Sequence, residues 1–207
     1  MSKDYFDHVA REWETMRKEF FSEIVREKAL EKAHMQPGTT AADIGAGTGF
    51  ITEGLLKKGV KIIAVDQSET MLTEMKKRFT GYNNIDYRTG TAEALPIPDG
   101  TVDYVFANMY LHHVDSPPDA IKEMVRTLKK GGILVITDLD EHSHEFLRTE
   151  HHDLWMGFKR EDVKQWFCSA GLDNVAVECT DENCCSQSQC GEEYARISIF
   201  MASGVKG

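Results

Sequence analysis

The chain has 207 residues with a formal net charge of −10, and 41% of its residues are hydrophobic. This content is enough for one domain with a substantial core, and the acidic balance argues against nucleic acid or an anionic membrane as main partner. No apolar run reaches about 18 residues, so no membrane span is expected, and the first residues lack the apolar core of a signal peptide. We therefore expect a cytoplasmic protein. All five cysteines follow residue 167, and in a reducing compartment free thiols or ligands are expected rather than disulfides.

The N-terminal segment carries the first helical pattern. Apolar residues recur at steps of three and four, at Phe6, Val9, Trp13, Met16, Phe20 and Ile24. This spacing predicts one amphipathic helix, which continues to about Ala33 and ends before Pro37 and Gly38.

Strands and helices then alternate along the chain. Strands are predicted at residues 40–44, 61–66, 85–88, 102–107, 133–137, 175–179 and 196–202. Helices are predicted at residues 50–57, 68–79, 116–130 and 163–170, with Ser68 as an N-cap. Alternating units of this kind predict an α/β fold with a doubly wound, parallel sheet and helices on both faces. Ligands bind such sheets beyond the carboxyl ends of the strands.

A glycine turn follows the first predicted strand. Its order is G-x-G-x-G, with Gly45, Gly47 and Gly49, and Asp43 precedes it. A dinucleotide site would read G-x-G-x-x-G and would receive a pyrophosphate, beside which Asp43 is poorly placed. Asp66 ends the next strand, about where a ribose hydroxyl pair needs an acceptor. The implied ligand has a ribose and an amino-acid-like end but no phosphates, which fits S-adenosylmethionine, with S-adenosylhomocysteine as product.

Simpler explanations exist for each of these residues. The glycines could form a tight turn that binds nothing. Asp43 could cap local backbone amides, and Asp66 could be a carboxylate that merely flanks a helix.

Several further motifs follow in order over residues 39–138. Gly90 to Pro96 reads G-T-A-E-A-L-P, and Leu111-His112-His113-Val114 follows a predicted strand. A Lys-Lys-Gly-Gly turn at residues 129–132 precedes the fifth strand. Together with the glycine turn and Asp66, these motifs resemble class I S-adenosylmethionine-dependent methyltransferases of the ubiquinone/menaquinone-biosynthesis group. The resemblance implies a Rossmann-like sheet of seven strands, mostly parallel, with the last strand antiparallel.

The resemblance also implies a set of cofactor-binding residues, which are Asp43, Gly45, Ala46, Gly47, Gly49, Asp66, Gln67, Met71, Thr91, Ala92, Glu93 and Asn108. Asp43 would help to hold the methionyl amino group. Thr91 departs from the family, which usually has Asp there to accept from the adenine amino group. Adenine recognition would then rest more on the Ala92 N–H and on Glu93. Glu93 could instead be a solvated helix residue, and Met71 could be ordinary core.

The resemblance divides the expected single domain, residues 1–207, into three segments. Residues 1–36 would form a helical lid over the cofactor, with Tyr5, Phe6 and Trp13 on its apolar side. Residues 37–140 would form the cofactor-binding core, and residues 141–207 would supply substrate-side helices and the last two strands.

Histidines and cysteines gather in the segments expected at the substrate side. His112, His113, His144 and His152 are candidates for a general base, although relatives carry a His-His pair across different chemistries and one member could be structural. No metal is expected, because the spacing matches no standard zinc pattern. His144, His152, Cys184, Cys185 and Cys190 are weak candidates for a metal, with the three cysteines expected between the last two strands.

The predicted function is methyl transfer from S-adenosylmethionine to a small-molecule acceptor by a monomer or homodimer, without nucleic acid or membrane as partner. One alternative is methylation of a soft metal, a metalloid such as arsenic, or a thiol bound by the cysteines and histidines. Another is a regulatory protein that binds the cofactor without catalysis. A nicotinamide-dependent oxidoreductase does not fit the glycine spacing or Asp43.

Overall fold

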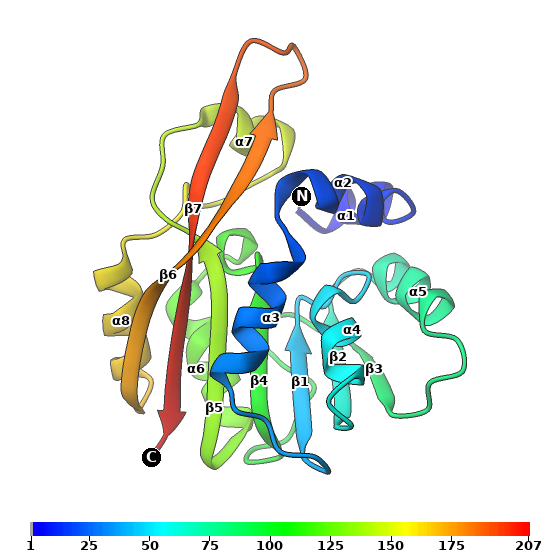
Figure 1. Cartoon of the computed structure of the whole chain (residues 1–207), viewed down its shortest axis with the longest axis vertical. Coiled ribbons are helices and arrows are strands. Elements are labelled where there is room, and N and C mark those ends of the chain that lie inside the picture. Colours follow the sequence, from blue (N-terminus) through cyan, green and yellow to red (C-terminus); the bar gives the residue numbers. More distant parts are fainter. Residues whose placement is uncertain (1) are drawn as a thin grey trace.

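The computed structural model describes residues 2–207, with side chains from Asp4 onward. Seven strands form one sheet in the order β3-β2-β1-β4-β5-β7-β6 (Figure 1). The strands are β1 (Thr40–Ile44), β2 (Lys61–Asp66), β3 (Ile85–Thr89), β4 (Val102–Asn108), β5 (Leu128–Leu139), β6 (Leu172–Gln187) and β7 (Tyr194–Lys206). Among the described strands, β7 runs opposite to the other six, so the predicted mostly parallel, Rossmann-like sheet is confirmed.

Helices cover both faces of this sheet. They are α1 (Ser2–Val9), α2 (Trp13–Phe20), α3 (Glu23–Lys32), α4 (Phe50–Leu56), α5 (Glu69–Arg78), the 3-10 helix η1 (Leu111–His113), α6 (Pro117–Thr127), α7 (Glu145–Glu150) and α8 (Arg160–Ser169). Buried residues of α6 and α8 pack into one apolar cluster, and those of α3 and α4 pack into another on the opposite face. Within the described residues, no helix is both long and apolar enough to cross a membrane.

The predicted single N-terminal helix is wrong, because the chain breaks it twice. It leaves α2 at Phe21, whose backbone is extended. The Ser22 hydroxyl then accepts a hydrogen bond from the Ile24 N–H at 3.3 Å and caps α3. A serine cap offers the backbone an alternative to continuing the helix. The break lets α1 and α2 lie across the carboxyl ends of the central strands, while α3 lies along the sheet (Figure 1).

The hairpin of β6 and β7 extends beyond the rest of the sheet (Figure 1). The prediction ended β6 at residue 179, but the strand continues to Gln187 after a bulge between Cys179 and Asn183. The bulge interrupts the alternating pattern, which hid the second half of the strand. Cys184 and Cys185 therefore lie within β6, and the prediction that they lie between the last strands is wrong; Cys190 does lie in the turn.

β7, which follows β6 in the chain, lies inside the sheet and not at its edge. β7 pairs with β5 on one side and with β6 on the other. Near its end, the Lys206 ammonium donates to the carbonyl oxygens of Arg126 at 3.2 Å and Leu128 at 2.8 Å. A cation at the last turn of α6 stabilises carbonyls that have no helical partner.

Candidate functional site

The glycine turn after β1 lines a cavity, named here the glycine cavity. Gly45 and Gly47 have positive φ angles of 67° and 53°, which L side chains rarely adopt. A Cβ at Gly47 would point toward Trp13, with Nε1 at 3.7 Å. A Cβ at Gly45 would lie 2.3 Å from the Tyr110 ring. Gly47 therefore presents bare backbone to the cavity, whereas Gly45 makes room for the Tyr110 ring.

Asp66 ties this turn to the start of α5. Its carboxylate accepts hydrogen bonds from the backbone N–H of Gly47 and of Ser68, both at 2.8 Å. The residue is buried at 8% exposure but lines the glycine cavity. Burial raises the pKa of Asp66 to about 6, against the lowering effect of these hydrogen bonds. Asp66 therefore places a fixed hydrogen-bond acceptor at the carboxyl end of β2.

Asp43 does not line the cavity. Its carboxylate accepts from the backbone N–H of Thr52 at 3.0 Å and from the Thr52 hydroxyl at 2.7 Å, at 2% exposure. Burial raises the pKa of Asp43 to about 7. The carboxylate anchors the first turn of α4, as in the capping alternative, and holds the glycine turn from behind.

Seven of the predicted cofactor-binding residues line the glycine cavity, namely Gly45, Ala46, Gly47, Asp66, Gln67, Met71 and Asn108. The other five, Asp43, Gly49, Thr91, Ala92 and Glu93, do not. A Cβ at Gly49 would lie 2.4 Å from the Phe79 ring, on the side of the core. Tyr110 packs against Gly45, and its hydroxyl lies against the backbone of Ala92. The Tyr110 ring therefore separates the glycine turn from the segment that carries Thr91.

Arg17 is the charged residue of this cavity that the sequence did not indicate. It lies on α2 with 1% exposure, and its guanidinium lies 4.5 Å from the centre of the Phe50 ring. Nη2 donates to Glu14 at 3.2 Å. Nε and Nη1 have no hydrogen-bond partner in the described part of the chain. Arg17 lines the glycine cavity and keeps two buried donors of a permanent cation without a partner.

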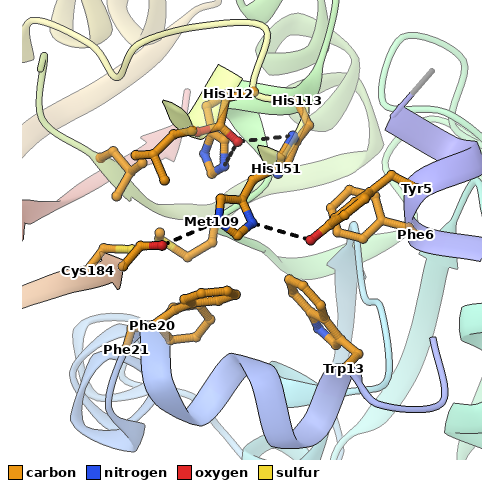
Figure 2. A pocket seen from close by; sticks show the side chains of 14 residues that line it. Tyr5, Phe6, Trp13, Phe20, Phe21, Met109, His112, His113, His151 and Cys184 are labelled. Carbon is orange, nitrogen blue, oxygen red and sulfur yellow. Dashed lines mark hydrogen bonds and ion pairs between the residues drawn. The ribbon is translucent and has the colours of Figure 1, made fainter. Parts of the chain in front are cut away.

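A second cavity, named here the histidine cavity, lies beside the first (Figure 2). Its lining residues are Tyr5, Phe6, Trp13, Phe20, Phe21, Met109, His112, His113, Leu139, Leu147, His151, Asp153, Cys184 and Ser186. Aromatic side chains from α1 and α2 form one side, and histidines from η1 and the loop after α7 form the other. Phe6, Trp13, Phe21, Met109 and His113 line both cavities.

Two carboxylates and two imidazoles meet at the wall of the histidine cavity. His112 Nδ1 lies 2.6 Å from Asp138, whose carboxylate also accepts from the N–H groups of Leu111 and Leu139. Asp153 Oδ1 lies 3.8 Å from His112 Nε2 and 3.9 Å from His113 Nδ1. The two rings are 4.1 Å apart between centres.

This arrangement gives the two histidines different pKa values. Burial opposes the charged form of His112, but Asp138 and Asp153 outweigh it and raise its pKa to about 9. Burial and the neighbouring His112 hold the pKa of His113 well below its usual range. His112 is therefore the charged ring near neutral pH, and His113 is the neutral one.

His151 crosses the middle of the histidine cavity (Figure 2). Its Nδ1 lies 3.3 Å from the Tyr5 hydroxyl, and its Nε2 lies 3.3 Å from the Ser186 hydroxyl. These contacts join α1 to β6 through one ring. Burial lowers the pKa of His151, which favours the neutral form.

The other predicted catalytic histidines lie outside both cavities. His144 precedes α7, and its ring centre is 5.7 Å from that of His142. His152 adopts a positive φ of 60° and packs beside Tyr5, with ring centres 5.1 Å apart. The structure brings His112 and His113 together at the cavity wall but leaves His144 and His152 away from it.

The weak metal candidates do not come together. Among the residues that the structure describes, the one group of three with metal-ligand geometry is His112, His113 and Asp153. Cys190 is exposed, Cys185 is half-buried, and Cys184 is buried in the histidine cavity. Burial raises the pKa of Cys184 to about 12, so its thiol stays protonated.

Sequence reasoning missed the two acidic partners of these histidines. Asp138 lies at the carboxyl end of β5, the strand next to β4, so its position at this sheet edge was a signal that could have found it. Asp153 carried no such signal. It arrives because the loop after α7 folds back, with the N–H groups of Leu154 and Trp155 donating to the His112 carbonyl at 3.0 and 3.1 Å.

Comparison with known proteins shows which class the chain resembles. Residues 42–136 match the methyltransferase domain family, and the fold is the Rossmann-like fold of solved methyltransferases. One solved structure, phosphoethanolamine N-methyltransferase 2 of Haemonchus contortus with phosphomonomethylethanolamine and S-adenosylhomocysteine, superposes with a TM-score of 0.73 at 17% identity. The match covers 87% of this chain and 52% of that one.

Within that class, the chain resembles the quinone-biosynthesis group. It is 31% identical over 162 residues to 2-methyl-6-phytyl-1,4-hydroquinone methyltransferase 1 of Oryza sativa subsp. japonica, a match that covers 76% of this chain and 48% of that protein. It is 30% identical over 154 residues to a ubiquinone/menaquinone biosynthesis C-methyltransferase of Hydrogenovibrio crunogenus, covering 70% of this chain and 61% of the relative. The chain thus spans about half to three-fifths of the length of these curated relatives.

Proposed function

We propose that this protein is an S-adenosylmethionine-dependent methyltransferase whose acceptor is a small, largely apolar molecule. One observation carries the proposal: the glycine cavity and the histidine cavity share a wall that includes Met109 and His113. A donor in the first and an acceptor in the second would meet at this wall. Holding the two reactants in line supplies several kcal/mol toward methyl transfer without any acid or base.

The glycine cavity fits S-adenosylmethionine at both ends of that molecule. Asp66 offers a carboxylate for the ribose hydroxyls, beside the bare backbone at Gly47. Arg17 offers two unsatisfied buried donors, which suit the methionyl carboxylate because a guanidinium binds carboxylates in a bidentate way. When bound, S-adenosylmethionine supplies a methyl group on a sulfonium, which is already a strong methyl donor.

The composition of the histidine cavity supports the choice of acceptor. Tyr5, Phe20 and Leu147 line it together with the shared aromatic residues, so a flat, apolar ring would be well covered. The polar groups concentrate on one wall, so the acceptor's reacting atom would face them. The relatives described above are named for hydroquinone and quinone-pathway methylation, which agrees with an acceptor of this kind.

His113 is the histidine that lines both cavities. It stays neutral, so its imidazole can accept a proton from the acceptor's nucleophile. His112 is charged and bound to Asp138, so it would orient and stabilise rather than act as a base.

The helices α1 and α2 supply a lid in this proposal. Phe6, Trp13 and Arg17 come from these two helices and line the glycine cavity. The Ser68 hydroxyl at the N-terminus of α5 donates to Asp7 of α1. Closure of this lid over both cavities would exclude water from the sulfonium.

Two measurements test the proposal. Calorimetric titration with S-adenosylmethionine and with NAD should show micromolar binding of the first only; tighter binding of NAD would contradict the cofactor assignment. Mass spectrometry with methyl-deuterated cofactor should then show labelled product from hydroquinones or phenols rather than from peptides or nucleic acids. Tight cofactor binding without transfer to any acceptor would instead favour the regulatory alternative.

A matched pair of variants tests the role of His113. His113→Ala should reduce methyl transfer at least about 100-fold, the usual scale for a lost acid–base group. His144→Ala, which changes a histidine outside both cavities, should leave the rate within about twofold. Equal losses in both variants would contradict the role of His113. The metalloid alternative is not favoured, because the relatives above are named for organic acceptors.

A further inference from the structure

We propose that His112, His113 and Asp153 form a site for one divalent cation of the zinc type at the wall of the histidine cavity. Each residue offers one ligand atom, and the three atoms lie within 4.8 Å of one another. All three residues have side chains that are at most 7% exposed. The presence of the cation does not depend on the methyl-transfer proposal; its part in catalysis does.

The distances between the ligand atoms are close to those that a zinc ion needs. Bonds of about 2.1 Å at tetrahedral angles place neighbouring ligand atoms roughly 3.4 Å apart. Asp153 Oδ1 lies 3.8 Å from His112 Nε2 and 3.9 Å from His113 Nδ1. Both separations exceed a hydrogen bond, and small side-chain rotations would close them onto a central ion.

His113 provides an independent indication of a missing ligand. Its Nδ1 is buried and has no hydrogen-bond partner among the residues that the structure describes. It points toward the same Asp153 oxygen that His112 faces. Leaving a buried ring nitrogen unsatisfied costs about 1–3 kcal/mol, which a bond to a cation would remove.

The second ring is already arranged as a metal ligand. His112 Nδ1 lies 2.6 Å from Asp138, and the Asp138 carboxylate is itself held by two backbone N–H groups. A carboxylate on the far nitrogen of a histidine fixes the tautomer that presents the other nitrogen to a metal. Neither Asp138 nor Asp153 pairs with a lysine or arginine within residues 4–207, so the charged His112 ring is the cation beside them. A zinc ion would replace the proton on His112 Nε2, which leaves to solvent, and would place two positive charges beside the two buried carboxylates.

Three protein ligands leave a fourth position for a ligand from the cavity. His112, His113 and Asp153 all line the histidine cavity, so that position would face the acceptor. Two imidazoles and one carboxylate with an open position are a donor set typical of catalytic zinc. The cation would bind a hydroxyl oxygen of the acceptor and lower its pKa, and the proton would leave to solvent. His113 would then hold the cation instead of accepting the proton itself.

The test uses the full-length protein purified without a polyhistidine tag, stripped with a chelating resin and then titrated with ZnCl₂. Elemental analysis should find about one equivalent, and Co²⁺ in place of Zn²⁺ should give visible d–d absorption. Asp153→Asn should weaken Zn²⁺ binding at least about 100-fold. His144→Ala and Cys190→Ser should not change it, because neither residue belongs to the group of three.

Separate readouts keep this inference distinct from the proposed function. Circular dichroism and binding of S-adenosylmethionine should be unchanged in Asp153→Asn, which shows that a loss of zinc is not a loss of fold. Should Asp153→Asn fail to fold, His113→Asn takes its place with the same expected loss of zinc. Zinc binding below a tenth of an equivalent, or equal in wild type and variant, would overturn the cation site whether or not methyl transfer is observed.

Discussion

The two adjoining cavities are built in different ways. The glycine cavity rests on the carboxyl ends of β1, β2 and β4, where backbone N–H groups and Asp66 define the surface. The histidine cavity is made almost wholly of side chains, which come from α1, α2, η1, the loop after α7 and β6. The first therefore follows from local turn chemistry, and the second follows from how distant segments pack. A change at a residue that lines one cavity alone should therefore affect the ligand of that cavity more than the ligand of the other.

The largest expected effect comes from removing Arg17, the positive charge that lines the glycine cavity. Arg17→Met removes the two unpaired donors but keeps a similar apolar volume, so S-adenosylmethionine should bind about 100-fold more weakly. Stability of the free protein should be unchanged or higher, because two unsatisfied buried donors are lost while Glu14 keeps its contacts with Arg78 and Thr48. Calorimetry and thermal unfolding measure the two quantities.

Arg26→Met is the matched control for Arg17→Met. Arg26 is equally buried and also lies over the Phe50 ring, but it pairs with Glu23, Glu27 and Glu53. Its loss should lower stability and leave cofactor affinity within about threefold. Weakened cofactor binding in the Arg26 variant but not in the Arg17 variant would refute the assignment.

A second effect concerns Asp43, which holds the glycine turn from behind. Its folded pKa of about 7 lies above its ordinary value of 3.8, so the folded state keeps a proton that the unfolded state loses between these values. Stability contributed by Asp43 should fall as pH rises from about 4 to 7 and stay low above pH 7. Asp43→Asn removes this dependence. The free energy of unfolding of the variant relative to wild type, measured with urea, should be about 3 kcal/mol higher at pH 7.5 than at pH 4.5. Parallel pH profiles of the two proteins would contradict this role of Asp43.

A third effect compares two glycines with nearly equal backbone angles. Gly49 and Gly81 have φ of 97° and 99°, so alanine costs about 1 kcal/mol at either position for the angle alone. A Cβ at Gly49 would also lie 2.4 Å from the buried Phe79 ring, whereas nothing lies within 4 Å at Gly81. Gly49→Ala should therefore be about 2 kcal/mol less stable than Gly81→Ala by thermal unfolding. Similar melting temperatures would show that the turn is looser than described.

The smallest expected effect tests whether the histidine cavity can be changed without changing cofactor binding. Tyr5→Phe removes the hydroxyl that lies 3.3 Å from His151 Nδ1 but does not alter the lining of the glycine cavity. The KM for the acceptor should rise about threefold, as expected for one neutral hydrogen bond, while affinity for S-adenosylmethionine should not change. A matching loss of cofactor affinity would show that the two cavities are coupled through α1.

The difference between the two cavities also explains how much of each could be predicted from the sequence. The sheet and the glycine turn follow from periodicity and from glycine spacing, which are local properties, and the seven strands are confirmed. Gln67, Asn108 and Asp66 lie at strand ends, and so their place at the cavity could be expected. Thr91 was expected beside the cofactor, but the Tyr110 ring lies between that segment and the turn. No spacing rule reports where a distant aromatic ring packs.

The histidine cavity was harder to predict for the same reason. Asp153 and His151 reach it through a loop whose path depends on two hydrogen bonds to the His112 carbonyl. Arg17 reaches the glycine cavity because Phe21 and Ser22 end one helix and start another, which the apolar pattern did not indicate. The apolar stripe at Phe6, Val9, Trp13, Met16 and Phe20 is only half-buried, and Ile24 is 51% exposed. The buried positions are neighbouring ones such as Arg17, Phe21 and Val25, because the break after α2 turns the helices relative to the single helix that was predicted.

The insertion of β7 between β5 and β6 has a consequence for synthesis on the ribosome. When translation has reached Gln187, β5 has an open edge and β6 has no partner, because β7 pairs with both. Exposed strand edges of this kind invite association between nascent chains. Cys184 and Ser186 also gain their place at the histidine cavity only when β7 pairs with β6. The cofactor side can thus mature early in biogenesis, whereas the acceptor side is completed by the last strand to emerge.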